Sequence, residues 1–216
     1  MRLQDFHRIF LVFCTVFALS APAAAHPHVW VTMRSELLYA PDGSITGIRH
    51  HWAFDDMFSA FATQGLQGKV KGQFTRQELA PLAKVNVESL KEYAYFTYAT
   101  ADGKKAPLSD PLPDYWLDYK NAILTLNFTL PFKKPVKAKF LKLEIYDPTI
   151  FVDFEFAKDS PVKLDNPPSG CRLDVVLPQE ITVAQSQSLG EQFFNSLSAS
   201  QNWGERYANK ILVNCP

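Results

Sequence analysis

The sequence predicts an α+β fold with a mostly antiparallel sheet, an N-terminal β-hairpin and two or three helices. Segments that alternate between apolar and polar residues outnumber segments with helical periodicity. Short turn sequences, not regularly spaced helices, separate most of these alternating segments. This order is typical of an antiparallel sheet and differs from the repeated βαβ units of a parallel one.

The N-terminal hairpin is the clearest predicted element. Residues Val29–Tyr39 and Ile45–Phe54 both alternate, and the Pro-Asp-Gly-Ser sequence at 41–44 is typical of a turn. When the turn is centred in this sequence, the large apolar residues fall on one face, as a half-buried strand pair requires. The same register places His50 on the apolar face and His51 on the opposite face.

Helices are expected at three places. Asp55 and Asp56 can cap a helix over residues 57–62. A second helix is predicted over 75–93, because this segment opens with the capping-box sequence Thr-Arg-Gln-Glu. A third is expected over 182–197.

The remainder of the chain is predicted to form strands. The segments concerned are rich in β-branched and aromatic residues and are bounded by Gly, Pro, Asn or Asp. The expected strands cover residues 95–100, 115–119, 122–130, 138–146, 150–156 and 173–177, and 208–213 is either a strand or the end of a helix.

Residues 1–25 are expected to be a secretory signal peptide. Basic residues come first, an apolar stretch too short to span a bilayer follows, and alanines occupy the cleavage positions. Cleavage after Ala25 would make His26 the first residue, whereas cleavage one or two residues earlier would not. We expect 26–216 to be a single periplasmic α+β domain, with 101–112 as the alternative place to divide it.

The charge balance argues against several classes of function. Removing residues 1–25 takes away Arg2, Arg8 and Asp5, so 22 basic and 22 acidic residues become 20 and 21. A chain this neutral does not bind nucleic acid by counterion release, and it lacks a basic membrane-binding stripe. Because no nucleophile elbow, phosphate-binding glycine loop or His-Glu-X-X-His sequence is present, we expect no enzymatic activity.

Two cysteines would remain after signal cleavage, Cys171 and Cys215. An even pair in an exported protein most simply forms a disulfide. The closed loop of roughly 45 residues would stabilise the fold by about 4 kcal/mol in the chain-entropy model. The alternative is a two-thiolate metal site, which the lack of Cys-X-X-Cys spacing disfavours.

Histidines near the new N-terminus predict a metal site. His26 would carry a free amine beside its imidazole, and His28 shares the outward side of the hairpin with Asp55. His51 faces the same side but lies roughly 13 Å along the strand from Asp55. Imidazole nitrogens and a carboxylate suit Zn²⁺, Ni²⁺, Co²⁺ or Cu²⁺. We therefore expect His26, His28 and Asp55 as ligands, His51 as a further candidate, and His50 in the core.

Three stretches of the chain resemble a bacterial periplasmic family of unknown function. They are His-Pro-His-Val-Trp at 26–30, His-His-Trp-Ala-Phe-Asp at 50–55 and Tyr-Asp-Pro-Thr at 146–149. Members are often labelled the periplasmic component of an uncharacterised ABC-type transport system, and relatives are associated with nickel/cobalt or zinc membrane transporters. The resemblance implies an accessory protein that captures or delivers a divalent ion for an inner-membrane transporter.

Two other functions stay open at this point. An N-terminal histidine that binds copper could make the chain a redox enzyme that activates oxygen. The chain could also be a structural or adaptor module of the envelope, whose histidines bind no metal. The second alternative predicts that added metal leaves the thermal stability unchanged, because a ligand of the native state must stabilise it.

Overall fold

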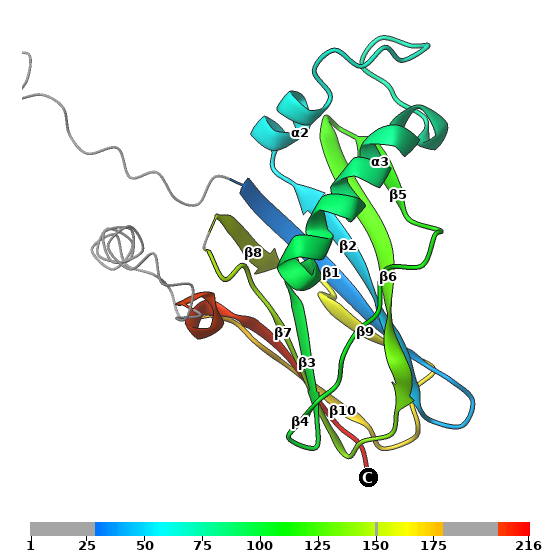
Figure 1. Ribbon diagram of the computed structural model, residues 1–216, viewed down its shortest axis with the longest axis vertical. Coiled ribbons are helices and arrows are strands. Elements are labelled where there is room, and N and C mark those ends of the chain that lie inside the picture. The colour runs from blue at the N-terminus through cyan, green and yellow to red at the C-terminus, as the bar shows by residue number, and fades with distance from the viewer. Residues whose placement is uncertain (1–28, 150, 179–202) are drawn as a thin grey trace, which may run out of the picture.

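Two β-sheets make up most of the computed structural model, which describes residues 29–149, 151–178 and 203–216 (Figure 1). Within these residues, the six-stranded sheet has the order β5-β6-β2-β1-β8, and β9 also pairs with β1. Its strands are β1 (Val29–Tyr39), β2 (Ile45–Phe54), β5 (Trp116–Lys120), β6 (Ile123–Val136), β8 (Val152–Phe156) and β9 (Val162–Asp165).

The five-stranded sheet has the order β10-β11-β7-β3-β4. Its strands are β3 (Thr97–Ala101), β4 (Lys104–Lys105), β7 (Phe140–Ile145), β10 (Arg172–Val176) and β11 (Asn209–Asn214). The helices of the described residues are α2 (Asp56–Ala62), α3 (Arg76–Leu90) and the 3₁₀ segments η1 (Lys91–Phe96) and η2 (Trp203–Tyr207).

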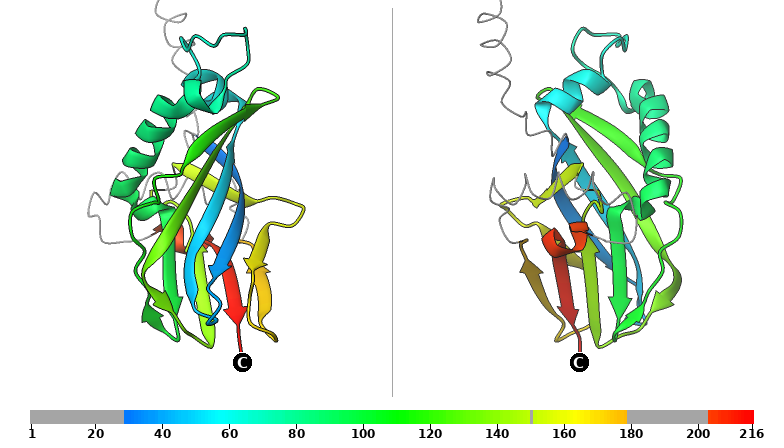
Figure 2. Two further views of the ribbon diagram at one scale, coloured as in Figure 1. Left: turned by 90° about the vertical axis from the view of Figure 1, so that its right-hand side faces the viewer. Right: turned by 60° about the vertical axis from the view of Figure 1, so that its left-hand side comes forward.

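The main hydrophobic core lies between the two sheets and continues under α3 (Figure 2). Met33 and Ile48 of the first sheet, Leu143 and Ile211 of the second, and Leu79 of α3 are all fully buried members of one cluster. Burial of such a side chain stabilises the fold by about 1.5–3 kcal/mol. Packing therefore determines which residues of the six-stranded sheet face the core. The residues of its outer face are not constrained by this packing.

The predicted fold class is confirmed. The strands pair mostly antiparallel, and the N-terminal hairpin has the predicted bounds and register, with Met33 opposite Trp52 and Leu37 opposite Ile48. The exceptions are β8 and β9, which both run parallel to β1. Parallel partners need long connections, and the chain passes through β2 to β7 before it forms β8 and β9 beside β1.

The end of α3 differs from the sequence-based expectation. The helix begins after the Thr75 capping box as predicted, but it ends at Leu90, and the following strand starts at Thr97. Between them Ala94, Tyr95 and Phe96 have φ values of 51°, 54° and 49°. Left-handed backbone costs roughly 1 kcal/mol or more for each such residue. Burial of the Tyr95 and Phe96 rings offsets this cost, and short-range sequence patterns carry no sign of it.

Some predicted features lie outside the described residues. They are the signal peptide over 1–25, both N-terminal histidines and the helix over 182–197, and they stay predictions. Among the helices that the structure does describe, none has the length and apolar character needed to span a bilayer.

His50 is a core residue, as predicted. It is fully buried, and its Nδ1 lies 3.0 Å from Ser35 Oγ and its Nε2 3.2 Å from Thr97 Oγ1. The Thr97 hydroxyl donates its hydrogen to Tyr95 O, so it must accept a hydrogen from Nε2 of His50. Both nitrogens of His50 are thus engaged, and the ring is not available as a ligand.

The pH dependence of stability should report this buried imidazole. Burial, followed by repulsion from His51, lowers the pKa of His50 from 6.5 to about 3. Below the ordinary pKa the unfolded chain binds a proton that the folded chain rejects, so acidification favours unfolding. Between about pH 7 and about pH 5 this group should lower the free energy of unfolding by about 2 kcal/mol. In urea titrations, His50→Gln should remove that part of the slope, and an unchanged slope would contradict this account.

Removal of the disulfide should destabilise the fold. Cys171 and Cys215 form a disulfide with a Cα–Cα distance of 4.1 Å, which links the start of β10 to the end of β11. A double Cys→Ser variant should lose up to about 4 kcal/mol of unfolding free energy, because the unfolded chain gains the entropy of a roughly 45-residue loop. Urea unfolding measures the loss. Treatment of the native protein with a thiol reductant should have a similar effect and leave the double variant unchanged.

Candidate functional site

The start of β1 is tied to the end of β2 by Asp55. The Asp55 N–H donates to Trp30 O, and its Oδ2 accepts from the Trp30 N–H, both at 2.9 Å. Its Oδ1 accepts from the Phe58 N–H at 2.7 Å and so caps α2, as the sequence predicts. One carboxylate therefore joins two of the sequence stretches described above and starts the helix that follows.

Asp147 ties the third stretch to the same place. This buried residue accepts hydrogen bonds from the backbone N–H groups of Thr149, Phe151 and Val152. The resulting turn presents Phe151 O to the Val29 N–H at 3.3 Å. The described residues of all three stretches thus meet at the start of β1, where the Asp147 carboxylate holds the turn.

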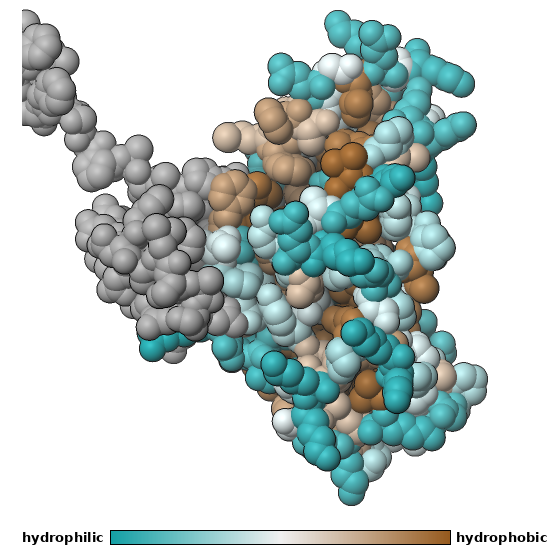
Figure 3. Space-filling view, viewed as in Figure 1, coloured by the Kyte–Doolittle hydropathy of each residue, from teal (hydrophilic) through white to brown (hydrophobic). Residues whose placement is uncertain are grey.

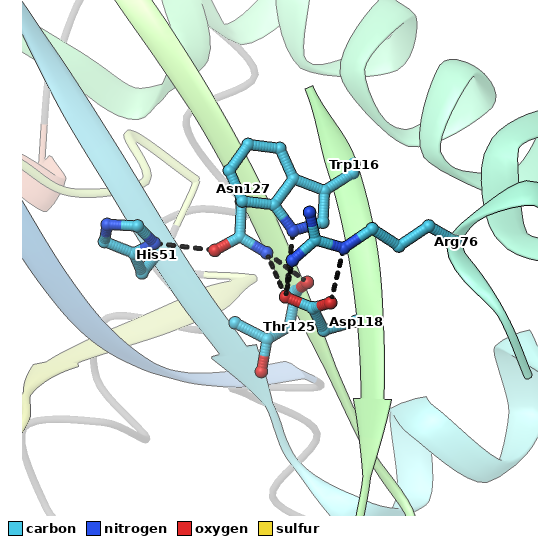
Figure 4. Close-up of polar contacts among 6 residues, drawn as sticks. All are labelled: His51, Arg76, Trp116, Asp118, Thr125 and Asn127. Atoms are coloured by element: carbon cyan, nitrogen blue, oxygen red, sulfur yellow. Dashed lines mark hydrogen bonds and ion pairs between the residues drawn. The ribbon is translucent and has the colours of Figure 1, made fainter. Parts of the chain in front are cut away.

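His51 lies on the outer face of the six-stranded sheet, directly opposite Asn127 of β6. Its Nδ1 is 2.6 Å from Asn127 Oδ1 (Figure 4). Asn127 is almost fully buried, so its amide must find partners within the protein.

The amide orientation of Asn127 follows from its other contacts. Its Nδ2 donates to Asp118 Oδ2 at 3.2 Å and to Thr125 O at 3.1 Å. Both of these partners are acceptors, so the NH₂ group must point toward them and Oδ1 must point toward His51.

Asp118 accepts hydrogen bonds from several side chains of this network. It accepts from Trp116 Nε1 at 2.8 Å and from Arg76 Nε at 2.9 Å, and the Arg76 guanidinium also lies 4.5 Å from the Trp116 ring centroid (Figure 4). Burial alone would raise the pKa of Asp118, but the hydrogen bonds from Trp116 and Arg76 outweigh it and hold the pKa below its usual range. The ionised carboxylate keeps the Asn127 amide oriented.

The network assigns the tautomer of His51. Since Asn127 Oδ1 can only accept, Nδ1 of His51 must carry the hydrogen, and the lone pair of the neutral ring lies on Nε2. Among the described residues, no hydrogen bond involves this Nε2. A histidine that donates from one nitrogen to an oxygen and presents the other as a lone pair has the arrangement usual for metal ligands.

Two further carboxylates lie beside β1 on this face. In the parallel pairing with β8, Asp153 is opposite Trp30 and Glu155 is opposite Thr32. Both residues are exposed, although the Asp153 carboxyl group is partly desolvated by its neighbours. This desolvation, followed by repulsion from Glu155, raises the pKa of Asp153.

The structure describes two of the four predicted ligands, His51 and Asp55. His51 is on the outer face and Asp55 directly follows the same strand, but the two are four positions apart, or roughly 13 Å along the strand direction. Between them on this face stands Ala53, which carries only a methyl group. His26 and His28 lie outside the described residues, and within those residues no group of three His, Cys, Asp or Glu side chains is arranged to hold a metal ion.

Sequence reasoning missed the residues that support His51. Asn127 interrupts the run Leu-Thr-Leu-Asn-Phe at 124–128, and its nearly complete burial makes it a polar residue that needs a partner. A polar residue in an apolar strand is a signal that sequence could give. The partner Asp118 follows only from the pairing of β5 with β6, and Arg76 only from the packing of α3 beside β5.

Loss of the Asn127 amide should change the tautomer of His51. In Asn127→Ala the acceptor for the Nδ1 hydrogen is gone, so the preference for this tautomer should disappear. The ¹⁵N chemical shifts of the imidazole ring distinguish the two forms. Val85→Ala, on the exposed side of α3, is the matched control and should leave the shifts unchanged. The same Nδ1-protonated spectrum in Asn127→Ala would refute the assignment.

Comparison with known proteins gives a family without an assigned activity. An "Uncharacterized protein" of Haemophilus influenzae is 23% identical over 202 residues, which cover 91% of this chain and 94% of that protein. The "Uncharacterized 15.5 kDa protein in trpE 3'region" of Spirochaeta aurantia is 33% identical over 94 residues, covering 43% of this chain and 66% of that protein. The model of the family described as "Protein of unknown function (DUF1007)" matches residues 11–215, and the chain belongs to this family.

Proposed function

We propose that this protein is a periplasmic, non-enzymatic accessory protein that binds a divalent transition ion and captures or delivers it for an inner-membrane transporter. The ion would be Zn²⁺, Ni²⁺, Co²⁺ or Cu²⁺, as the nitrogen ligands favour. His26 and His28 would supply ligands from the N-terminal segment. His51 and Asp55 are the candidate ligands from the sheet. Because they lie roughly 13 Å apart along the direction of β2, one ion would take one of them together with the N-terminal histidines.

The observation that carries this proposal is the orientation of His51. Its Nδ1 is committed to Asn127, and its Nε2 has no hydrogen-bond partner among the described residues. Building this arrangement takes a buried amide, an ionised carboxylate and an arginine. A histidine with only a surface role would not need its ring held in one tautomer, whereas a ligand gains affinity from it.

Asp55 supports the proposal in a more limited way. Each of its carboxylate oxygens already accepts one backbone hydrogen bond, which leaves one lone pair on each oxygen. An ion at this position would lie beside Trp30, where the N-terminal segment joins β1. Because such a site would draw ligands from two segments, it could release the ion when one segment moves, as delivery requires.

The transport role rests on resemblance. The family relatives that match this chain carry no assigned activity, so the link to an ABC-type transporter comes from the three sequence stretches alone. That these stretches meet at the start of β1 supports the view that they serve one site.

Metal titration of the exported protein tests the proposal. Intact mass fixes the first residue and the metal stoichiometry, and calorimetry with each of the four ions measures affinity. A saturating ion at 100 times its Kd should raise the free energy of unfolding by about 2.7 kcal/mol. His51→Gln should weaken binding at least about tenfold, because a ligand nitrogen is lost, and Asn127→Ala about tenfold, because the ring is no longer oriented.

Arg49→Gln is the matched control. Arg49 is two residues from His51 on the same face of β2 and should leave metal affinity unchanged. Failure of all four ions to bind saturably would refute the metal proposal. Consumption of a reductant by the copper-loaded protein would instead favour the redox-enzyme alternative.

A further inference from the structure

One end of the molecule is formed by residues 57–75, which comprise α2 after its first residue, Asp56, and the loop that leads to α3. We call this segment the α2 tip. Its loop projects beyond the end of the sheets in all three ribbon views, α2 lies beside the end of β6, and the C-terminus lies at the opposite end (Figures 1 and 2). The tip is thus the part of the described chain that would meet a flat surface first if the molecule approached with its long axis upright.

Helix α2 has apolar side chains on two sides. Its inner side packs against the sheet: the Phe58 and Phe54 rings are 4.5 Å apart, and Ser59 is fully buried, with its Oγ accepting from the Leu124 N–H. Its outer side presents Met57 and Phe61, which are 72% and 75% exposed. These two residues are four positions apart, so they share one face of the helix.

The loop adds two exposed apolar side chains among polar ones. Val70 is 55% exposed and Leu66 38% exposed. Val70 starts a tight turn that closes with the Gln73 N–H donating to Val70 O, and Gly72 supplies the positive φ of 72° that this turn needs. Val70 and Lys71 of this turn are both exposed.

The charges of the tip are all positive. Lys69 and Lys71 are both exposed, and residues 57–75 contain no acidic side chain. The nearest acidic groups are Asp56, before the tip, and Glu78, whose oxygens accept from the backbone N–H groups of Lys69 and Thr75. The positive charge of the tip is therefore that of Lys69 and Lys71, in its loop, with one acidic group at each of its borders.

We propose that the α2 tip binds the surface of an anionic lipid bilayer. Exposed Phe, Met, Val and Leu side chains suit the boundary between head groups and acyl chains, and lysines beside them suit anionic head groups. The apolar side chains lie on a helix and a turn that protrude, and over α2 they form a continuous apolar area (Figure 3). A protruding surface of this kind suits insertion into a fluid interface better than it suits a preformed protein groove.

This proposal does not depend on metal binding. It has a consequence for the candidate site, because Asp55 caps α2 and contacts Trp30. Insertion of the tip would hold the start of β1 close to the bilayer, where any membrane partner of the protein resides.

Vesicle binding by the full exported chain tests the proposal. Vesicles of phosphatidylethanolamine and phosphatidylglycerol are compared with vesicles of phosphatidylcholine, and bound protein is measured by co-sedimentation at low and high salt. We expect binding to the anionic vesicles that weakens with salt. The Met57→Ser/Phe61→Ser variant should bind at least about tenfold more weakly, and Lys69→Gln/Lys71→Gln about 20-fold more weakly at low salt. In Phe61→Trp, the new tryptophan should shift to shorter emission wavelengths with anionic vesicles.

Val85→Ser is the matched control, because Val85 is 62% exposed but lies on α3 outside the tip. It should bind like the parent chain, and equal midpoints of urea unfolding show that all variants fold. The proposal is overturned if the parent chain ignores anionic vesicles, or if Met57→Ser/Phe61→Ser binds them equally well. A dimer that this double variant dissociates, with no vesicle response of Phe61→Trp, would assign the tip to a second copy of the chain instead.

Discussion

The antiparallel pairing of β1 with β2 is the constraint on which the rest of the structure depends. Its register is set by apolar residues on one face, where Met33, Ile48 and Trp52 are almost fully buried. A slip of one residue would turn this face to solvent and cost many kcal/mol of burial energy. The same two-residue period sends His50 into the core and His51 outward. Two adjacent histidines thereby acquire opposite environments, opposite tautomers and different chemical capacities.

The outer face shows how the fold gives one of these histidines a defined state. The ion pair between Arg76 and Asp118 is partly exposed, so it contributes little to stability, about 1 kcal/mol or less. Its effect is geometric: it holds a carboxylate against Asn127, and Asn127 holds the ring of His51. A surface contact of small energy can thus decide which nitrogen of a neighbouring ring is open to a ligand.

At the start of β1, the carboxylate oxygens of Asp55 that stabilise the fold are also the oxygens proposed to bind an ion. Asp55 caps α2 and bonds the Trp30 backbone, so any ion that it bound would share its oxygens with the fold. The α2 tip follows directly from this cap, and its outer side carries apolar residues that the core does not need. The candidate metal site and the proposed membrane surface are therefore neighbours along the chain and in space.

The sequence by itself determined the hairpin and its register, the caps of α2 and α3, the burial of His50 and the cysteine pair. Each depends on spacings of a few residues or on a choice among very few partners. Other features needed the tertiary structure, because they join residues far apart in the chain. The parallel pairing of β8 and β9 with β1, the support of His51 by Asn127, Asp118 and Arg76, and the left-handed turn at 94–96 are of this kind. The exposure of Met57 and Phe61 is another, because periodicity shows that a helix has apolar faces, but only packing decides which of them is covered.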